Sequence, residues 1–150
     1  MLRDSIKAAQ VAAMKSGDKP RVAAVRLILA KIKDRDIELR TADKTPDDDD
    51  LVIEVLQKMA KQRRESIDLF RQGGREDRAE AESAELAVIE EFMPAQLSEA
   101  DTKAAIESIK ADLGATGMKD MGKVMAELKS RHGSELDMSK ASGLVKAALA

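Results

Sequence analysis

The sequence has no cysteine, tryptophan or tyrosine and only two phenylalanines among 150 residues. Without cysteine, a disulfide framework, a zinc knuckle and a thiol nucleophile are all excluded. So few aromatic residues argue against a β-rich core. No apolar run is long enough to span a membrane, and Asp4, Lys7 and Lys15 interrupt the region where a signal peptide would be apolar. These absences predict a water-soluble, cytoplasmic protein that does not enter the membrane.

Charged residues are abundant instead, at 36% of the chain, while glycine and proline are few. This composition is typical of long amphipathic helices and predicts an all-α fold. The net charge of −2 conceals an uneven distribution. Residues 1–40 hold ten Lys/Arg against five Asp/Glu, whereas residues 81–101 hold six acids and no base. A polyanionic partner is therefore compatible with the charge of the basic segments, although the net charge of the whole chain would argue against it.

Helix signals divide the first part of the chain into four segments. The first is expected over residues 2–16, ending at Gly17, a residue suited to the left-handed C-terminal position. The second starts with Asp18 as cap and Pro20 in its first turn, and its apolar periodicity continues to residue 39. The third is expected to begin with Thr45 as cap and Pro46 next to it. The aspartates that follow, residues 47–50, fit the positive end of a helix dipole better than a cation site, which is the alternative.

The third and fourth helices, the latter expected over residues 75–92, are joined by a short turn containing two glycines. Such a turn makes them antiparallel neighbours. A basic cluster on one helix would then lie beside acids on the other, which predicts charge pairing within the chain, with a ligand site as the alternative. The residues concerned are Lys58, Lys61, Arg63 and Arg64, and Glu80, Glu82, Glu85, Glu90 and Glu91.

A domain boundary is expected at "FMPAQLSEAD", because Pro94 breaks the helix and Ser98 with Asp101 forms a capping box for the next one. The sequence thus predicts an N-terminal helical domain over 1–94 and a small domain over 96–150 with three helices, at 99–113, 121–131 and 137–149. Its expected core comprises Ile106, Ile109, Leu113, Met121, Val124, Met125, Leu128, Leu136, Leu144 and Val145.

The segment "GMKDMGKV", residues 117–124, has the GxxxxGK frame of a phosphate-binding loop. Val124 occupies the position where a hydroxyl would bind Mg²⁺, and the preceding segment has helical rather than strand periodicity. We therefore expect an amphipathic helix capped by Asp120. Gly122 would lie in its first turn and cost up to about 1 kcal/mol relative to alanine. Either a neighbouring helix packs closely there, or a partner's backbone reaches the first-turn N–H groups beside Lys119 and Lys123, as an RNA phosphate would.

Four blocks in order, "KQRRESIDLFRQGGRED", "EFMPAQLSEAD", "GATGMKDMGKVM" and "GLVKAALA", resemble the GatB/YqeY family over essentially the whole chain. The resemblance implies an N-terminal helical domain followed by a small domain similar to the tail of the B subunit of the glutamine-dependent tRNA amidotransferase, which contacts tRNA. The family label is carbon–nitrogen ligase activity with glutamine as amido-N-donor. The chain has no counterpart of the catalytic domain, so no catalytic residue, metal or cofactor is assigned. The single histidine, His132, is expected to cap a helix end.

The leading hypothesis is a tRNA-binding or tRNA-amidotransferase-related accessory protein that contacts phosphate and RNA shape, since aromatic side chains for base stacking are almost absent. An amidotransferase or synthetase is a possible protein partner. The alternative is a protein–protein interaction module that uses the methionines at 118, 121, 125 and 138, unless these lie in the core. The RNA-binding candidates are Lys119, Asp120, Gly122, Lys123, Lys129, Arg131, Lys140 and Lys146, with Arg21, Arg26, Lys31, Lys33 and Arg35 in the second helix.

Overall fold

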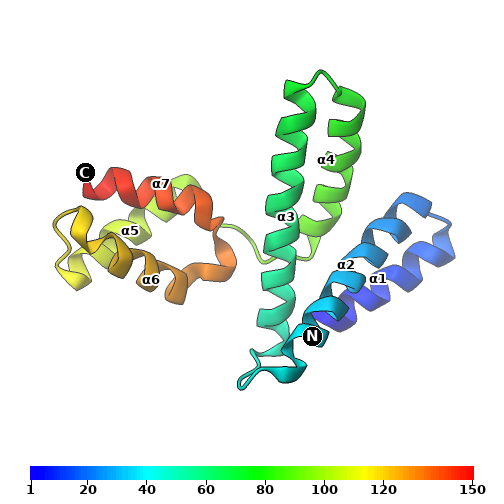
Figure 1. The fold of residues 1–150 in the computed structure, drawn as a ribbon, viewed down its shortest axis with the longest axis horizontal. Helices are drawn as coiled ribbons and strands as arrows, with labels where there is room; N and C mark the ends of the chain where they lie inside the picture. Colours follow the sequence, from blue (N-terminus) through cyan, green and yellow to red (C-terminus); the bar gives the residue numbers. More distant parts are fainter. The chain divides into compact units, whose positions relative to one another are not determined.

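The computed structural model describes the backbone of residues 1–150 and all side chains except those of Ser134 and Ser139. Within it every regular element is a helix, which confirms the all-α fold (Figure 1). The α-helices are α1 (Leu2–Ser16), α2 (Lys19–Glu38), α3 (Asp48–Gln72), α4 (Glu76–Glu91), α5 (Glu99–Leu113), α6 (Met121–His132) and α7 (Met138–Leu149). Contacts group the chain into two compact units, unit 1 (Met1–Met93) and unit 2 (Pro94–Ala150).

The α1–α2 hairpin forms as its local signals predict. Gly17 adopts a left-handed conformation with φ of 73°, which ends α1. The Asp18 carboxylate accepts a hydrogen bond of 3.2 Å from the backbone N–H of Arg21, and Pro20 lies in the first turn of α2. The cap and the proline together fix the start of α2.

The start of α3 differs from the expectation. The helix begins at Asp48, with Asp47 at the N-cap position and no capping hydrogen bond from its side chain, so Thr45 lies outside the helix and is not its cap. Asp48, Asp49 and Asp50 occupy the first turn, where the helix dipole favours negative charge. Thr45 is displaced because two of these aspartates are engaged by the N-terminal segment of the chain.

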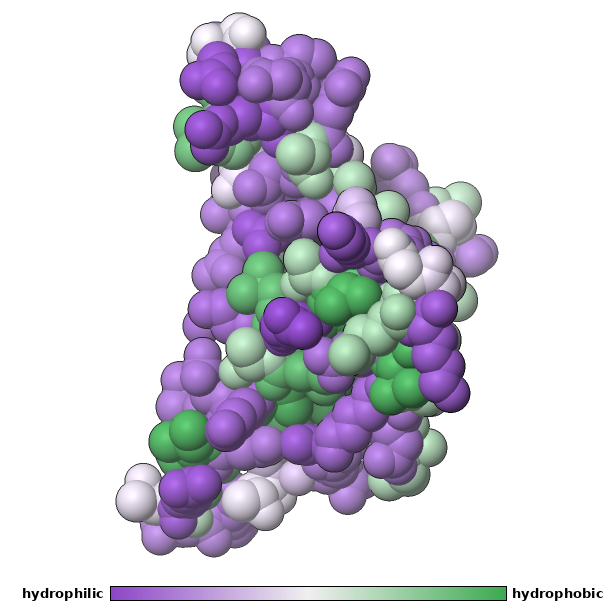
Figure 2. Space-filling model, turned by 90° about the vertical axis from the view of Figure 1, so that its right-hand side faces the viewer, coloured by the Kyte–Doolittle hydropathy of each residue, from purple (hydrophilic) through white to green (hydrophobic). Residues whose placement is uncertain are grey.

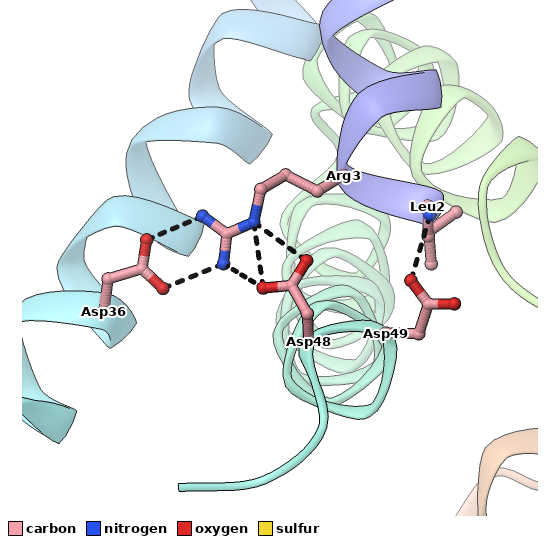
Figure 3. A network of polar contacts seen from close by, with 5 residues as sticks. All are labelled: Leu2, Arg3, Asp36, Asp48 and Asp49. Atoms are coloured by element: carbon pink, nitrogen blue, oxygen red, sulfur yellow. Dashed lines mark hydrogen bonds and ion pairs between the residues drawn. The ribbon is translucent and has the colours of Figure 1, made fainter.

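Arg3 joins three helices of unit 1 in a single polar network (Figure 3). Its guanidinium donates to Asp36 of α2 at 2.7 and 2.9 Å and to Asp48 of α3 at distances down to 2.7 Å. The backbone N–H of Leu2 donates to Asp49 at 3.0 Å. The hydrogen bonds that Arg3 donates, first to Asp36 and then to Asp48, raise the pKa of Arg3, and the hydrogen bond from Arg3 lowers the pKa of Asp36. The network therefore fixes the beginning of α1 against α2 and α3.

The core of unit 1 draws on all four of its long helices. Ile6, Ile28, Leu56 and Ile89 are among its fully buried side chains. On α2, Ile28 is fully buried while Leu29 is only half-buried. Further half-buried apolar side chains pack around this core. Apolar surface consequently stays open to solvent, and Figure 2 shows it gathered on one face within a hydrophilic surround.

Helices α3 and α4 form a long hairpin that closes at Gly73 and Gly74. Arg63 lies 3.1 Å from Glu82 and 3.0 Å from Glu85, and Arg64 lies 3.0 Å from Glu90. The predicted charge pairing along the hairpin is confirmed for these two arginines. Glu91 instead reaches back to Arg21 of α2, at 2.8 Å.

Unit 2 packs α5, α6 and α7 around a small core. The Ser98 hydroxyl accepts a hydrogen bond of 3.1 Å from the N–H of Asp101, as the capping box predicts, and Gly114 ends α5 with φ of 64°. Leu113 was expected in the core but is 43% exposed, because it lies one turn beyond Ile109 where the helix ends. The buried residues are Ile106, Ile109, Val124, Leu128, Leu136, Ala141, Val145 and Leu149.

Candidate nucleic-acid interface

The loop before α6 is fixed by Asp120. Asp120 lies at the expected N-cap position of α6, but its side chain makes no capping hydrogen bond to the helix. Its carboxylate accepts instead from the backbone N–H of Thr116 at 3.0 Å, on the loop side. This hydrogen bond, followed by one from Gly117, lowers the pKa of Asp120. Asp120 therefore stays ionised at neutral pH and fixes the approach to α6.

The N–H groups at this helix start are partly engaged. Residues Met118–Asp120 form a 3₁₀ turn that runs directly into α6. Within it, the N–H of Asp120 donates to Gly117 and the N–H of Met121 donates to Met118. An anion here would therefore rely on lysine side chains more than on a cradle of free backbone amides.

Gly122 is exposed and has open space around it. A Cβ built on this residue would meet no atom within 4 Å outside its own helical turn and chain neighbours. Close packing of another helix of this chain thus gives no reason for glycine at this position. Gly143, in the middle of α7, is likewise exposed and open. Gly143 is not among the predicted site residues, although a glycine inside a helix is a sequence signal that could have identified it as one.

Lysines surround both glycines on the exposed faces of α6 and α7. None of them forms an ion pair within the described part of the structure. Helix α7 contains no acidic residue, and the one acid of α6, Glu127, lies 2.7 Å from Arg131. Net positive charge is thereby concentrated on α6 and α7, because α5 carries four acids against two lysines. The lysines are Lys119, Lys123, Lys129, Lys140 and Lys146.

Three predicted site residues are engaged in folding contacts instead. Arg131 bridges Glu127 and Asp112, the latter at 3.0 Å. Arg21 pairs with Glu91, and Arg35 pairs with Glu38 at 2.9 Å and Glu54 at 3.4 Å. The hydrogen bonds that Arg131 donates, first to Glu127 and then to Asp112, raise the pKa of Arg131. These three guanidiniums are therefore weaker candidates for an RNA contact than the unpaired lysines.

The α2 candidates Arg26, Lys31 and Lys33 are exposed and form no ion pair among the described residues. They belong to unit 1, whereas the candidates on α6 and α7 belong to unit 2. Each group is therefore a candidate surface of its own unit.

Other side chains of unit 2 have structural roles. Lys110 donates to the carbonyl oxygen of Ala148 at 2.8 Å and so caps the end of α7, a contact that the sequence did not reveal. His132 ends α6, with Nδ1 3.7 Å from a carboxylate oxygen of Glu135. Met121, Met125 and Met138 pack against the core while Met118 is 45% exposed, so most of the proposed methionine surface is internal.

In the described chain, no helix combines the length and apolarity needed to cross a membrane. Within the same limits, no group of three or more acidic or histidine side chains is arranged to hold a metal ion.

Comparison with known proteins supports the resemblance seen in the four sequence blocks. The altered inheritance of mitochondria protein 41, mitochondrial, of Eremothecium gossypii is 34% identical over 122 residues, a match that covers 81% of this chain. The chain spans 58% of that relative's length. The model of the family described as Yqey-like protein matches residues 3–149. The chain therefore belongs to the YqeY-like protein family.

Proposed function

We propose that this protein binds RNA of the tRNA type through phosphate contacts made by the exposed faces of α6 and α7. The observation that carries the proposal is Gly122, a helix glycine with open space around it. It lies next to Lys123 and close to Lys119, and neither lysine has an ion pair in the described structure. A glycine that no internal contact requires, placed among unpaired lysines, suits close approach by an external polyanion.

The surface of α6 is well suited to a phosphate backbone. Gly122, Ala126 and Ser130 are small and exposed, and they recur every four residues, on one side of the helix. Lys123 and Lys129 flank this smooth strip. A sugar–phosphate chain can therefore lie close to the helix while the lysines reach its oxygens as mobile point charges.

Recognition of this kind depends on RNA shape and charge. Both phenylalanines of the chain, Phe70 and Phe92, lie in unit 1, so unit 2 has no phenylalanine, tyrosine or tryptophan ring on which a base could stack. Phosphate and ribose contacts are sufficient for folded RNA. The resemblance of unit 2 to an amidotransferase tail supports tRNA as the RNA and an accessory role beside a tRNA-modifying enzyme. The ligase chemistry of the family label is assigned to no residue of this chain.

The test measures binding of an unmodified tRNA transcript by the full chain at increasing salt, using fluorescence anisotropy. Affinity should fall steeply, and Lys123→Gln should lower the slope of log K against log salt by about one. Gly122→Ala should weaken binding although it stabilises the helix by up to about 1 kcal/mol. The control is Lys103→Gln on α5, where Lys103 pairs with Glu99 at 3.1 Å.

Two results would refute the proposal. One is the absence of binding even at low salt. The other is an affinity that Lys123→Glu leaves unchanged, because reversal of one charge among so few should be strongly unfavourable.

A protein partner is the alternative, and the exposed apolar side chains of unit 1 favour it. Val11 and Met14 on α1 are 50% and 58% exposed, and Leu69 on α3 is 68% exposed. Capture of partners from cell extract, with and without ribonuclease, separates the two functions. Partners that survive ribonuclease bind the protein directly, whereas partners lost on treatment are bridged by RNA.

A further inference from the structure

A cleft lies within unit 1, between α2 and α3, and none of its lining residues belongs to the helices used in the proposed function. Its volume is about 160 Å³, room for about five water molecules. Lys31, Asp34 and Arg35 line it from α2, and Lys58 and Gln62 line it from α3. These side chains recur at helical spacings of three and four, so each wall is a single helix face.

The positive charges of the cleft are not equally available. Arg35 is held by Glu38 at 2.9 Å and by Glu54 at 3.4 Å. Lys31 and Lys58, on opposite walls, are exposed and form no ion pair within the described residues. Glu38 also lines the cleft, so its lining residues carry three cations, Lys31, Arg35 and Lys58, against two carboxylates, Asp34 and Glu38. Because Arg35 and Glu38 pair with each other, the ammonium groups of Lys31 and Lys58 face the carboxylate of Asp34, and the lining has a small net positive charge. This charge attracts an anion.

The lining also includes apolar surface. Val55 and Met59 of α3 line the cleft and are almost fully buried, at 8% and 5% exposure. Neither offers a hydrogen bond, so an inorganic ion would leave this surface unused. The exposed amide of Gln62, one helical turn from Lys58, adds hydrogen-bond donors at the rim.

We propose that this cleft binds the phosphate group of an organic phosphate. Lys31 and Lys58 attract it from opposite walls, Gln62 donates to one of its oxygens, and the organic part rests on Val55 and Met59. Several oxygens on a tetrahedral centre can meet donors from two helices at once, which a single planar carboxylate does less well. The phosphate can belong to a free small molecule or to an RNA backbone, and only the second source depends on the proposed function.

The experiment titrates ¹⁵N-labelled full chain with phenyl phosphate and follows its amide signals by NMR. A saturable shift is expected for the side-chain amide of Gln62 and for backbone signals of α2 and α3, with weaker binding of inorganic phosphate. Lys31→Gln and Lys58→Gln should each weaken binding about two- to fivefold. Asp34→Asn should tighten it by a similar factor of about two to five, because it removes the opposing charge.

The gain in affinity for Asp34→Asn is the most informative result, since a misfolded variant cannot produce it. Lys15→Gln, on α1 and outside the cleft, should leave binding unchanged. Competition by tRNA would assign the site to an RNA phosphate, and lack of competition would assign it to a free organic phosphate. The proposal fails if no shift saturates, or if all three cleft variants bind as the original protein does. Neither outcome involves Lys123, so failure of the cleft proposal can be distinguished from failure of the proposed RNA binding by α6.

Discussion

The two units use positive charge in different ways. Unit 1 contains ten of the eleven arginines of the chain. Six of them, including Arg3 and Arg63, pair with acids that lie on another helix. Unit 2 has one arginine, and the lysines on its α6 and α7 form no ion pair within the described structure.

This difference matches the chemistry of the arginine and lysine side chains. The planar guanidinium makes two-pronged, directional contacts and is suited to holding helices together. The ammonium group of lysine is a hydrated point charge on a flexible stem, which suits a partner that must bind and leave. The comparison indicates that arginine stabilises unit 1, and it fits the phosphate contacts proposed for the lysines of unit 2.

The largest expected effect tests whether the units are separate folding domains. Leu128→Ala removes a fully buried side chain from the core of unit 2 and should cost about 2–5 kcal/mol. A unit of this size has little stability in reserve, so unit 2 should unfold while unit 1 persists. Hydrogen exchange resolved by segment measures this.

Leu113→Ala is the matched control, because Leu113 is 43% exposed and its truncation should change little. Loss of amide protection in α1 to α4 as well would show that the units fold together and would break the comparison.

The next effect concerns the arginine network of unit 1. Arg3→Ala removes the hydrogen bonds to Asp36 and Asp48, whose side chains are 38% and 40% exposed. Allowing for this exposure, we expect a loss of about 1–2 kcal/mol in the free energy of unfolding of unit 1, measured by urea denaturation. Arg26→Ala, which removes an exposed guanidinium of α2, should cost much less. Equal costs would mean that the network does not stabilise the unit.

A smaller effect of opposite sign is expected in unit 2. Gly143→Ala should stabilise α7 by up to about 1 kcal/mol, because the added methyl group meets open space and alanine is the better helix former. The melting temperature should rise accordingly. Gly114→Ala is the contrasting variant, since φ of 64° makes any side chain there unfavourable and the melting temperature should fall. Destabilisation by Gly143→Ala would point to a packing role for this glycine.

The smallest effect is a dependence of stability on pH. The Asp36 pKa is lowered on folding, so this group stabilises the folded state above its unfolded pKa of about 4. The contribution is lost as the pH falls through the lower pKa of the folded state. Urea midpoints of unit 1, measured from neutral pH down to about pH 2, should decline, and Asp36→Asn should flatten that decline. An unchanged slope in this variant would assign the acid sensitivity to other carboxylates.

The features predicted best from the sequence are the helix ends that depend only on neighbouring residues. Gly17, Asp18 and Ser98 mark helix ends through their own conformational preferences and hydrogen bonds to nearby residues. The start of α3 was misplaced because Asp48 and Asp49 interact with residues more than forty positions away. No local pattern contains that information.

The residue types of the candidate site could be predicted from the sequence, but which of its positive side chains are held in ion pairs could not. Lys123 and Gly122 could be singled out from the motif alone. Arg21, Arg35 and Arg131 each pair with a carboxylate on another helix. These pairs depend on which helices meet, which the sequence alone does not show. Asp120 lies at the predicted N-cap position, but its carboxylate accepts a hydrogen bond from the preceding loop instead of from α6. The 3₁₀ turn that precedes α6 directs the carboxylate toward the loop.

The contacts of Arg63 have a consequence for how the α3–α4 hairpin tolerates change. One guanidinium lies between Glu82 and Glu85, which are one turn apart on α4. Sliding α4 by one turn would move these acids by about 5.4 Å and separate at least one of them from Arg63. The axial register of the hairpin is thus set in the middle of α4 as well as at the turn, where Arg71 of α3 lies 3.4 Å from Glu76 of α4.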